Sequence, residues 1–312
     1  MDPTTKPALP PKLVLFFGIL AVSTASIFIR LAQTEAPSLV IAALRMGLAA
    51  LVLTPVVLLR RRQELRQLKP ADWRTLLFSG FFLALHFAAW ITSLELTSIA
   101  SSVVLVTTTP LWVAIASPLL LHEKITRSLA IGLLLALIGG VITASAQNCG
   151  ISQGAFSCNF DGAWLQGSSM IGNLLAWLGA LFAASYLMVG KKMRGRVDVL
   201  VYIYVVYSAA AIFLLIGVFL KGYPLLGYSA NFYAYALLLA LIPQLIGHSA
   251  YNWALGYLPA TYVSISLLGE PIGTIILAFL LLRSTPGWLE IGGGLLILTG
   301  IALASLDNNR NR

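Results

Sequence analysis

The segment HFAAWITSLELT, residues 86–97, is matched 162 positions later by HSAYNWALGYLP, residues 248–259. With the register shifted by one residue, more pairs align along the two halves of the chain: Pro110 with Pro271, Gly132 with Gly293, Gly139 with Gly300, Gly18 with Gly179, and Arg30 with Lys191. Recurrence at a fixed offset indicates an internal duplication, with its midpoint near residue 155.

The composition predicts a membrane protein. Apolar residues make up 59% of the 312 residues and charged residues 10%, whereas about 25% of a soluble globular domain is charged. The formal net charge of +9 raises the alternative of a nucleic-acid partner. The basic residues, however, lie in short links between apolar stretches and form no patch on a soluble domain. We therefore expect a lipid bilayer as the surroundings and no nucleic acid as a partner.

Ten apolar segments are long enough to cross the hydrocarbon core as helices, which takes about 20 residues each. They are 13–32, 38–59, 74–94, 99–121, 127–146, 170–190, 199–220, 233–254, 260–282 and 287–306. The expected fold is an all-α integral membrane protein of ten transmembrane helices in two five-helix repeats, residues 13–146 and 170–306. A tail at 1–12, a loop at 147–169 and a tail at 307–312 complete the chain. The first apolar stretch is interpreted as a span and not as a cleaved signal peptide.

The basic residues predict the orientation. With the N-terminus in the cytoplasm, sixteen of the 20 lysine and arginine residues fall on the cytoplasmic side, and Arg30, Lys221 and Arg283 fall outside. This positive-inside bias predicts cytoplasmic N- and C-termini and an external loop at 147–169. Because each repeat has an odd number of spans, the second must cross in the opposite sense to the first. We therefore expect inverted repeats related by an axis in the membrane plane.

Both cysteines of the chain, Cys149 and Cys158, lie in the predicted external loop. Outside the cytoplasm a disulfide between them is expected. Two free thiols are the alternative if the loop is cytosolic. A metal site is not expected, because no histidine lies near the pair.

Several stretches resemble a known family. They are ALGYLPATYVSISLLGEPIGTIILAFLLL (254–282), GGGLLILTGIALA (292–304), SLELTSIASSVVLVTTTPLWVA (93–114), LLLHEKIT (119–126) and ALRMGLAAL (43–51). In this order the chain, over about residues 12–306, resembles the EamA-type family of the drug/metabolite transporter superfamily. The resemblance implies a ten-span protein that moves small metabolites across the inner membrane, often outward, including amino acids in some members. The loop from Gln147 to Ser169 departs from the family pattern, and so does Thr109, which stands where an acidic counterpart of Glu270 would be.

His86 and His248 occupy matching positions, so inverted repeats would place them across a central cavity. Helical spacing puts Trp90 on the same face as His86 and Asn252 on the same face as His248, with Tyr251 on the neighbouring stripe. Imidazole, amide and aromatic groups together suit a small polar molecule with a flat or apolar part. The alternative is that each histidine satisfies a helix carbonyl within the core. Two histidines without a third ligand do not predict a metal site.

Arg45 and Glu270 lie deep in spans, where a charge costs about 2.5–3.5 kcal/mol on insertion scales, so both should face the bundle interior. The fork of Arg45 suits a substrate carboxylate or phosphate; alternatively Arg45 snorkels outward or pairs with Glu35 or Glu95. Glu270 precedes Pro271, which tends to kink a helix. We interpret this pair as a coupling or gating element and consider proton coupling. Alternatively, Glu270 is structural and pairs with Arg45 or caps a broken turn.

Other small and polar residues are assigned to packing. Hydroxyl groups in two spans either line a path or, as we expect, bridge helices: Ser101, Ser102, Thr107, Thr108, Thr109, Ser264, Ser266 and Thr274. Glycines indicate close helix packing or a dimer face: Gly132, Gly139, Gly292, Gly293 and Gly300. The link at 122–124 is interpreted as a solvated loop at the inner mouth, with a role in gating as the alternative.

These features predict a secondary transporter, of the exporter type, for small metabolites such as amino acids in the plasma membrane (bacterial inner membrane). Purines, drugs and nucleotide-linked sugars are the alternative substrates. Phosphorylated cargo would favour several basic residues in the cavity, and Arg45 is the one at depth. A membrane enzyme would need a cluster of nucleophiles, bases or metal ligands, and a non-transporting scaffold would need no central polar residues. No cofactor is expected, and the chain is expected to be a monomer or a homodimer.

Overall fold

The structure is a computed structural model that describes residues 7, 9–97, 99–145, 149–152, 155–158, 167–282 and 287–310. The described residues are 83% helical. Within the described ranges, seven helices are long and apolar enough to cross a membrane, and shorter apolar helices lie at Val104–Leu120, Arg127–Thr143 and Trp288–Ala304. The protein is therefore an all-α, multi-pass membrane protein, as predicted. The number of ten spans and the sides of the termini remain predictions.

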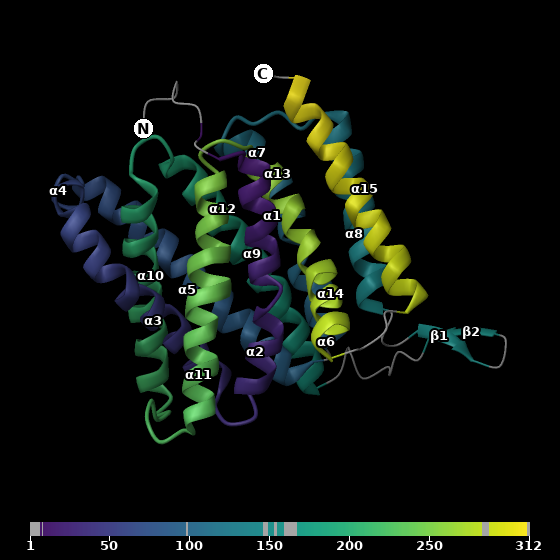
Figure 1. The fold of residues 1–312 in the computed structure, drawn as a ribbon, viewed down its shortest axis with the longest axis horizontal. Helices are drawn as coiled ribbons and strands as arrows, with labels where there is room; N and C mark the ends of the chain where they lie inside the picture. Colours follow the sequence, from purple (N-terminus) through teal and green to yellow (C-terminus); the bar gives the residue numbers. More distant parts are fainter. Residues whose placement is uncertain are drawn as a thin grey trace.

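The first half contains α1 (Pro11–Val22), α2 (Ala25–Ala32), α3 (Ser38–Arg60), α4 (Arg62–Arg66), α5 (Pro70–Leu96), α6 (Ile99–Val106), α7 (Thr109–Leu120) and α8 (Arg127–Ser145). A hairpin of β1 (Cys149–Ser152) and β2 (Ala155–Cys158) follows and projects from the helical body (Figure 1). The second half contains α9 (Gly167–Met193), α10 (Val199–Leu220), α11 (Ala230–Leu239), the π-helix η2 (Ala240–His248), α12 (Ser249–Ala254), α13 (Ala260–Ser266), the 3₁₀ turn η3 (Leu267–Gly269), α14 (Glu270–Leu282) and α15 (Trp288–Arg310).

The hairpin brings the two cysteines of the chain together. Cys149 and Cys158 are register partners in its antiparallel ladder, and Cys158 is disulfide-bonded in the structure. The register agrees with the disulfide expected from the sequence, which thiol labelling would test.

Several expected spans are interrupted helices. The span expected at 99–121 breaks between α6 and α7, and the span expected at 260–282 breaks at η3. These two breaks occupy equivalent positions in the two halves, and each comes just before a proline, Pro110 or Pro271. A proline lacks the N–H group that would continue the helix, which explains why both helices stop there. A third break separates α1 from α2 within 13–32.

Hydroxyl groups compensate for the lost helical hydrogen bonds. At the end of α6, three consecutive threonines donate to carbonyl oxygens three residues earlier, at 2.6–2.9 Å: Thr107 to Val104, Thr108 to Leu105 and Thr109 to Val106. At the break in the second half, Ser23, between α1 and α2, donates to the carbonyl of Glu270 at 2.9 Å, and Thr274 donates to the carbonyl of Ser23 at 3.0 Å. Thr274 thus bridges helices as predicted, and Ser23, for which no role was predicted, does the same. The three threonines mainly bond within their own helix.

Glycine contacts show that the two halves are inverted. A Cβ atom at Gly132 would lie 2.6 Å from the carbonyl oxygen of Gly300, and one at Gly139 would lie 2.6 Å from that of Gly293. The residue numbers rise along α8 as they fall along α15, so these equivalent helices are antiparallel; Figure 1 shows them side by side. The glycines thus permit close packing within the chain, one of the two uses predicted for them.

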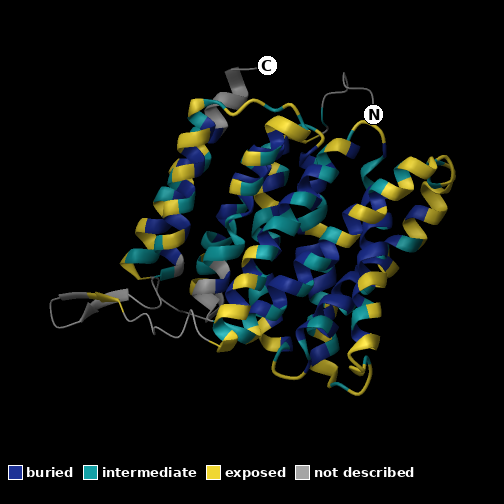
Figure 2. Ribbon diagram, turned by 180° about the vertical axis from the view of Figure 1, so that it is seen from behind, coloured by how far each residue is buried: buried dark blue, intermediate teal, exposed yellow. Residues whose placement is uncertain are grey.

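A second close approach relates the two halves near their centre. Gly18 of α1 packs against the backbone of Gly247 in η2, and Gly179 of α9 packs against Trp90 of α5. Gly18 and Gly179 are sequence equivalents, so each repeat places its first helix against the third span of the other. Figure 2 shows buried residues concentrated in the middle of the helical body. Large apolar side chains such as Leu59 and Leu220, 84% and 82% exposed, cover the outside, as expected in lipid.

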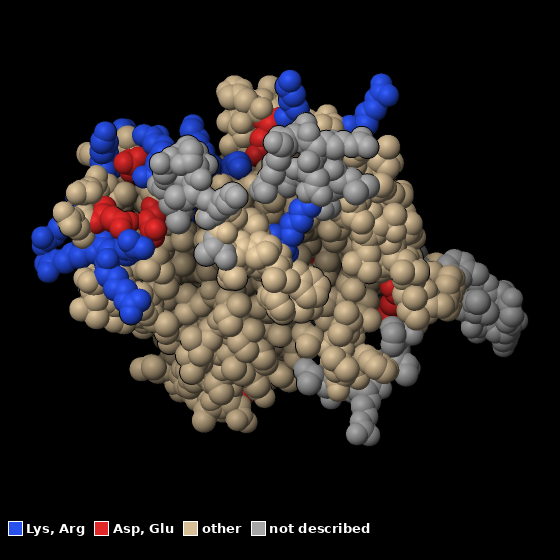
Figure 3. All heavy atoms as spheres, turned by 45° about the horizontal axis from the view of Figure 1, so that its top comes forward, with Lys and Arg blue, Asp and Glu red and all other residues tan. Residues whose placement is uncertain are grey.

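Lysine and arginine side chains gather at one end of the molecule, where the ends of the described chain also lie (Figures 1 and 3). This end carries α4 and the links around 122–127 and 191–198. We call it the basic end. It is the end that the charge distribution predicts to be cytoplasmic.

Candidate functional site

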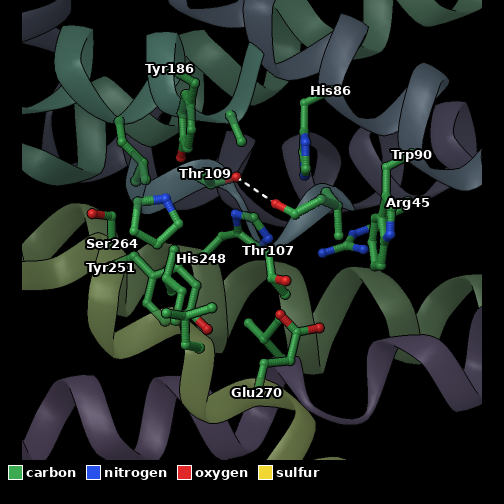
Figure 4. A pocket seen from close by; sticks show the side chains of 17 residues that line it. Arg45, His86, Trp90, Thr107, Thr109, Tyr186, His248, Tyr251, Ser264 and Glu270 are labelled. Atoms are coloured by element: carbon green, nitrogen blue, oxygen red, sulfur yellow. Dashed lines mark hydrogen bonds between the residues drawn. The ribbon is translucent and has the colours of Figure 1, made fainter. Parts of the chain in front are cut away.

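A pocket lies between the two halves, next to both helix breaks. Six of the predicted site residues line it: Arg45, His86, Trp90, His248, Tyr251 and Glu270. Figure 4 shows their side chains converging on a common space from α3, α5, η2, α12 and α14. Further polar residues at its wall are Thr107, Thr109, Tyr186 and Ser264. The apolar part of the wall includes Val22, Val106, Leu187, Leu267 and Leu268.

Arg45 is 0% exposed and is held at two points. Its Nε atom donates a hydrogen bond to Oε1 of Gln244 at 2.9 Å. Its guanidinium carbon lies 4.2 Å from the ring centroid of Phe87, a cation–π contact. The terminal nitrogens Nη1 and Nη2 have no hydrogen-bond partner among the described residues.

The alternative partners suggested for Arg45 are engaged elsewhere. Glu95 accepts hydrogen bonds from the backbone and hydroxyl of Ser38 at the start of α3. Glu35 accepts hydrogen bonds from the backbone and hydroxyl of Ser229, which caps α11. Arg45 also does not reach solvent, so the snorkelling alternative is wrong.

Glu270 opens α14 immediately after the break at η3, and its side chain lines the same pocket as Arg45. The ion pairs found among the described residues do not join these two side chains. A direct Arg45–Glu270 ion pair is therefore not found among the described residues, although the two charges share the pocket. Pro271 lies next in α14 and is not among the lining residues.

The two equivalent histidines both line the pocket but differ in their contacts. His86 Nδ1 donates to the carbonyl oxygen of Gly179 at 2.9 Å, and its ring stacks on Trp90 with centroids 5.9 Å apart. His86 therefore combines both predicted roles, cavity lining and a bond to a helix carbonyl. His248 Nδ1 has no partner among the described residues, and its ring contacts Phe87 edge to face.

Asn252 lies behind the pocket wall and does not line it. It is fully buried, and its amide bonds to the hydroxyl of Tyr186 and to the carbonyl of His248. Asn252, predicted to bind substrate, is therefore in contact with a pocket-lining residue, Tyr186, and not with the pocket itself.

Five buried polar atoms of the pocket wall have no partner among the described residues: Arg45 Nη1 and Nη2, Trp90 Nε1, His248 Nδ1 and the Tyr251 hydroxyl. Seven such atoms lie elsewhere in the described part of the chain. A buried polar group left unsatisfied costs about 1–3 kcal/mol, so folded proteins keep such groups few. Several in one pocket mark the place where a polar ligand would bond.

In the link at 122–124, predicted to be a solvated loop, His122 and Lys124 are exposed, whereas Glu123 joins the two halves at the basic end. Both carboxylate oxygens of Glu123 lie 3.0 Å from the backbone nitrogen of Ala260, and one lies 3.5 Å from that of Thr261. The Glu123 side chain is 15% exposed. A carboxylate at the start of α13 also interacts favourably with the helix dipole.

Lys191 reinforces the same contact from the end of α9. Its Nζ atom donates to the carbonyl oxygens of Leu255 and Leu258 at 3.1 and 2.9 Å and lies 3.9 Å from Glu123. We call Glu123, Lys191 and the α12–α13 turn the basic-end latch. With the offset of 161, the residue equivalent to Glu123 is Ser284, so the charge of this contact is not repeated in the other half.

Interrupted helices beside a polar pocket, set between inverted repeats, are the architecture of secondary transporters. The model of the EamA-like transporter family matches residues 11–145 and 170–306, which are the two halves described above. The chain belongs to the EamA-like transporter family, consistent with the drug/metabolite transporter superfamily, as the sequence resemblance predicted.

A solved structure, whose title reads only "Crystal structure of protein", shares this fold. It is 21% identical to the chain, has a TM-score of 0.75, and the match covers 97% of this chain and 98% of that one. No curated protein matches the chain.

Three neighbours of the site were not predicted: Gln244, Phe87 and Tyr186. Charge and the symmetry between the halves indicated the other site residues. Gln244 is uncharged, and its first-half equivalents at 82 and 83 are apolar. An amide or a phenol in the middle of an apolar span is the signal that would have identified Gln244 and Tyr186.

Proposed function

We propose that this protein is a secondary transporter that exports small zwitterionic metabolites, such as amino acids, across the plasma membrane. Membership of the family supports a small-molecule substrate and a bilayer setting. The observation that carries the substrate class is that Arg45 and Glu270 line one pocket without pairing with each other.

A zwitterion satisfies both charges at once. Its carboxylate would bond to Nη1 and Nη2 of Arg45, a geometry that suits the guanidinium fork. Its ammonium group would approach the carboxylate of Glu270. An apolar side chain would pack on the Trp90 ring and on the aliphatic residues of the wall. Purines, drugs and nucleotide-linked sugars are the alternative, but Arg45 is the one lysine or arginine among the described residues that line the pocket.

Alternating access supplies the transport step. The two broken spans stand at equivalent positions on the pocket, so the inverted halves can exchange open and closed roles. In this proposal the contacts of the basic-end latch close the pocket toward the basic end. If the basic end is cytoplasmic, its release admits substrate from the cell interior, in line with the outward direction implied by the family resemblance.

Flux in proteoliposomes against a panel of amino acids, purines and cationic drugs, with and without a proton gradient, tests the proposal. We expect saturable movement of amino acids and an effect of the gradient that Glu270→Gln abolishes. Movement of purines or drugs alone would favour the alternative substrates. A gradient effect that survives Glu270→Gln would remove this residue from proton coupling.

A further inference from the structure

Gln244 is the one side chain bonded to Arg45 among the described residues, and it belongs to the opposite half of the chain. The bond from Arg45 Nε to Gln244 Oε1 measures 2.9 Å, and both residues are 0% exposed. Arginine only donates hydrogen bonds, so the amide oxygen of Gln244 must face it.

This bond fixes the direction of the guanidinium plane. With Nε bound to Gln244 and one face on Phe87, rotation about the last bonds of Arg45 is restricted. The edge that remains carries Nη1 and Nη2, which have no partner among the described residues. Arg45 therefore presents a pair of charged donors whose direction is set before any ligand arrives, which lowers the entropy lost on binding.

The Gln244 side chain is an uncharged amide, and this matters for the charge beside Arg45. An amide accepts the Nε–H bond without placing a negative charge in contact with Arg45. A glutamate at the same place would form a buried ion pair and reduce the attraction for a second carboxylate. Gln244 thus combines orientation with retention of charge, the two properties that a carboxylate site requires.

The backbone around Gln244 also differs between the two halves. Residues 240–248 form a π-helix that contains Pro243, whereas the equivalent part of the first half lies in the α-helix α5. The first-half residues at this position are Phe82 and Leu83, which are apolar. π-Helical segments occur frequently at functional sites. The Arg45–Gln244 bond, which joins the two halves, therefore has no symmetric counterpart, because the first-half equivalents of Gln244 are apolar.

We propose that Gln244 is a positioning residue that makes the pocket selective for carboxylate-bearing substrates by orienting Arg45 without neutralising it. The inference rests on the proposed function for its consequence in transport, but the orientation itself can be tested separately.

The orientation is tested by NMR of the protein in nanodiscs with ¹⁵N-labelled arginine. Arg45→Lys identifies the Nε–H signal of Arg45. We expect Gln244→Leu to move this signal and to speed its exchange with water. Gln33→Leu is the matched control, because Gln33 bonds to Ser38 and to the Ile91 carbonyl, outside the pocket wall. An Arg45 signal unchanged in Gln244→Leu would overturn the proposal whether or not any substrate is transported.

Selectivity is tested by flux of L-leucine and of leucinamide, which lacks the carboxylate. We expect the wild-type preference for leucine to fall by about tenfold or more in Gln244→Glu, and the KM for leucine to rise in Gln244→Leu more than kcat falls. Unchanged preference in Gln244→Glu would overturn the specificity role. A wild-type protein that moves neither probe would contradict the proposed function, and the NMR signal would still decide the orientation.

Discussion

The Nδ1 atom of His86 lies 2.9 Å from the carbonyl oxygen of Gly179, and the equivalent histidine, His248, has no such bond among the described residues. Replacement by alanine should therefore affect stability differently at the two positions. His86→Ala loses a buried hydrogen bond worth about 1 kcal/mol, whereas His248→Ala removes a group that was not satisfied. We expect both variants to lose most transport, with a larger fall in Tm for His86→Ala. Flux and thermal unfolding of the same preparations check this, and wild-type flux in both variants would remove the histidines from the site.

The glycine contact between α8 and α15 should limit side-chain size. A Cβ atom at Gly132 would lie 2.6 Å from the carbonyl oxygen of Gly300, so Gly132→Ala should destabilise the protein by about 1–3 kcal/mol. Gly292→Ala is the matched control on α15, because a Cβ atom there meets nothing within 4 Å. Thermal unfolding in detergent measures the difference. Equal Tm values for the two variants would contradict the close approach of these helices.

The basic-end latch should set which end of the pocket is closed. Glu123→Gln removes the negative charge that accepts hydrogen bonds from the N–H groups of α13 and that lies 3.9 Å from Lys191. The basic end should therefore open more often in this variant. Spin labels at Lys124→Cys and Tyr257→Cys, in a background without native cysteines, would report longer distances by pulsed EPR. Glu290→Gln, in the α15 cap, is the control and should leave the distances unchanged. Identical distributions in all three proteins would show that the latch does not control closure.

The hairpin β1–β2 should carry a disulfide. Cys149 and Cys158 should resist maleimide labelling without reductant and react after reduction, because their register sets them opposite each other. Cys149→Ser should leave Cys158 labelled without reductant. Ready labelling of the untreated wild-type protein would disprove the bond.

The duplication could be found from the sequence because the pairs that it aligns are packing residues. Gly132 and Gly293 align by number, and both lie in the same helix–helix contact. The apolar stretches likewise predicted where the helices run. A kink at Pro271 was predicted, but the break at 107–108 was not, because mean hydropathy does not register lost backbone hydrogen bonds. The signals were present as three threonines before Pro110 and as Gly269 and Glu270 before Pro271.

The site was predicted where symmetry or charge indicated it and missed where neither did. His86, His248, Arg45 and Glu270 all line the pocket. The contact of Glu123 with α13 joins residues 137 positions apart, and the bond from Arg45 to Gln244 joins residues 199 apart. No local pattern in the chain encodes such contacts, so they required the packed structure.

The central claim is that Arg45 and Glu270 together bind a zwitterion that the protein then transports. Its most direct test is counterflow of labelled L-leucine in proteoliposomes, with leucinamide and N-acetylleucine as competitors that each lack one of the two charges. The account predicts saturable flux that unlabelled leucine inhibits and the two analogues do not, and loss of that flux in Arg45→Gln. Undiminished flux in Arg45→Gln, or inhibition by both analogues as strong as that by leucine, would contradict it.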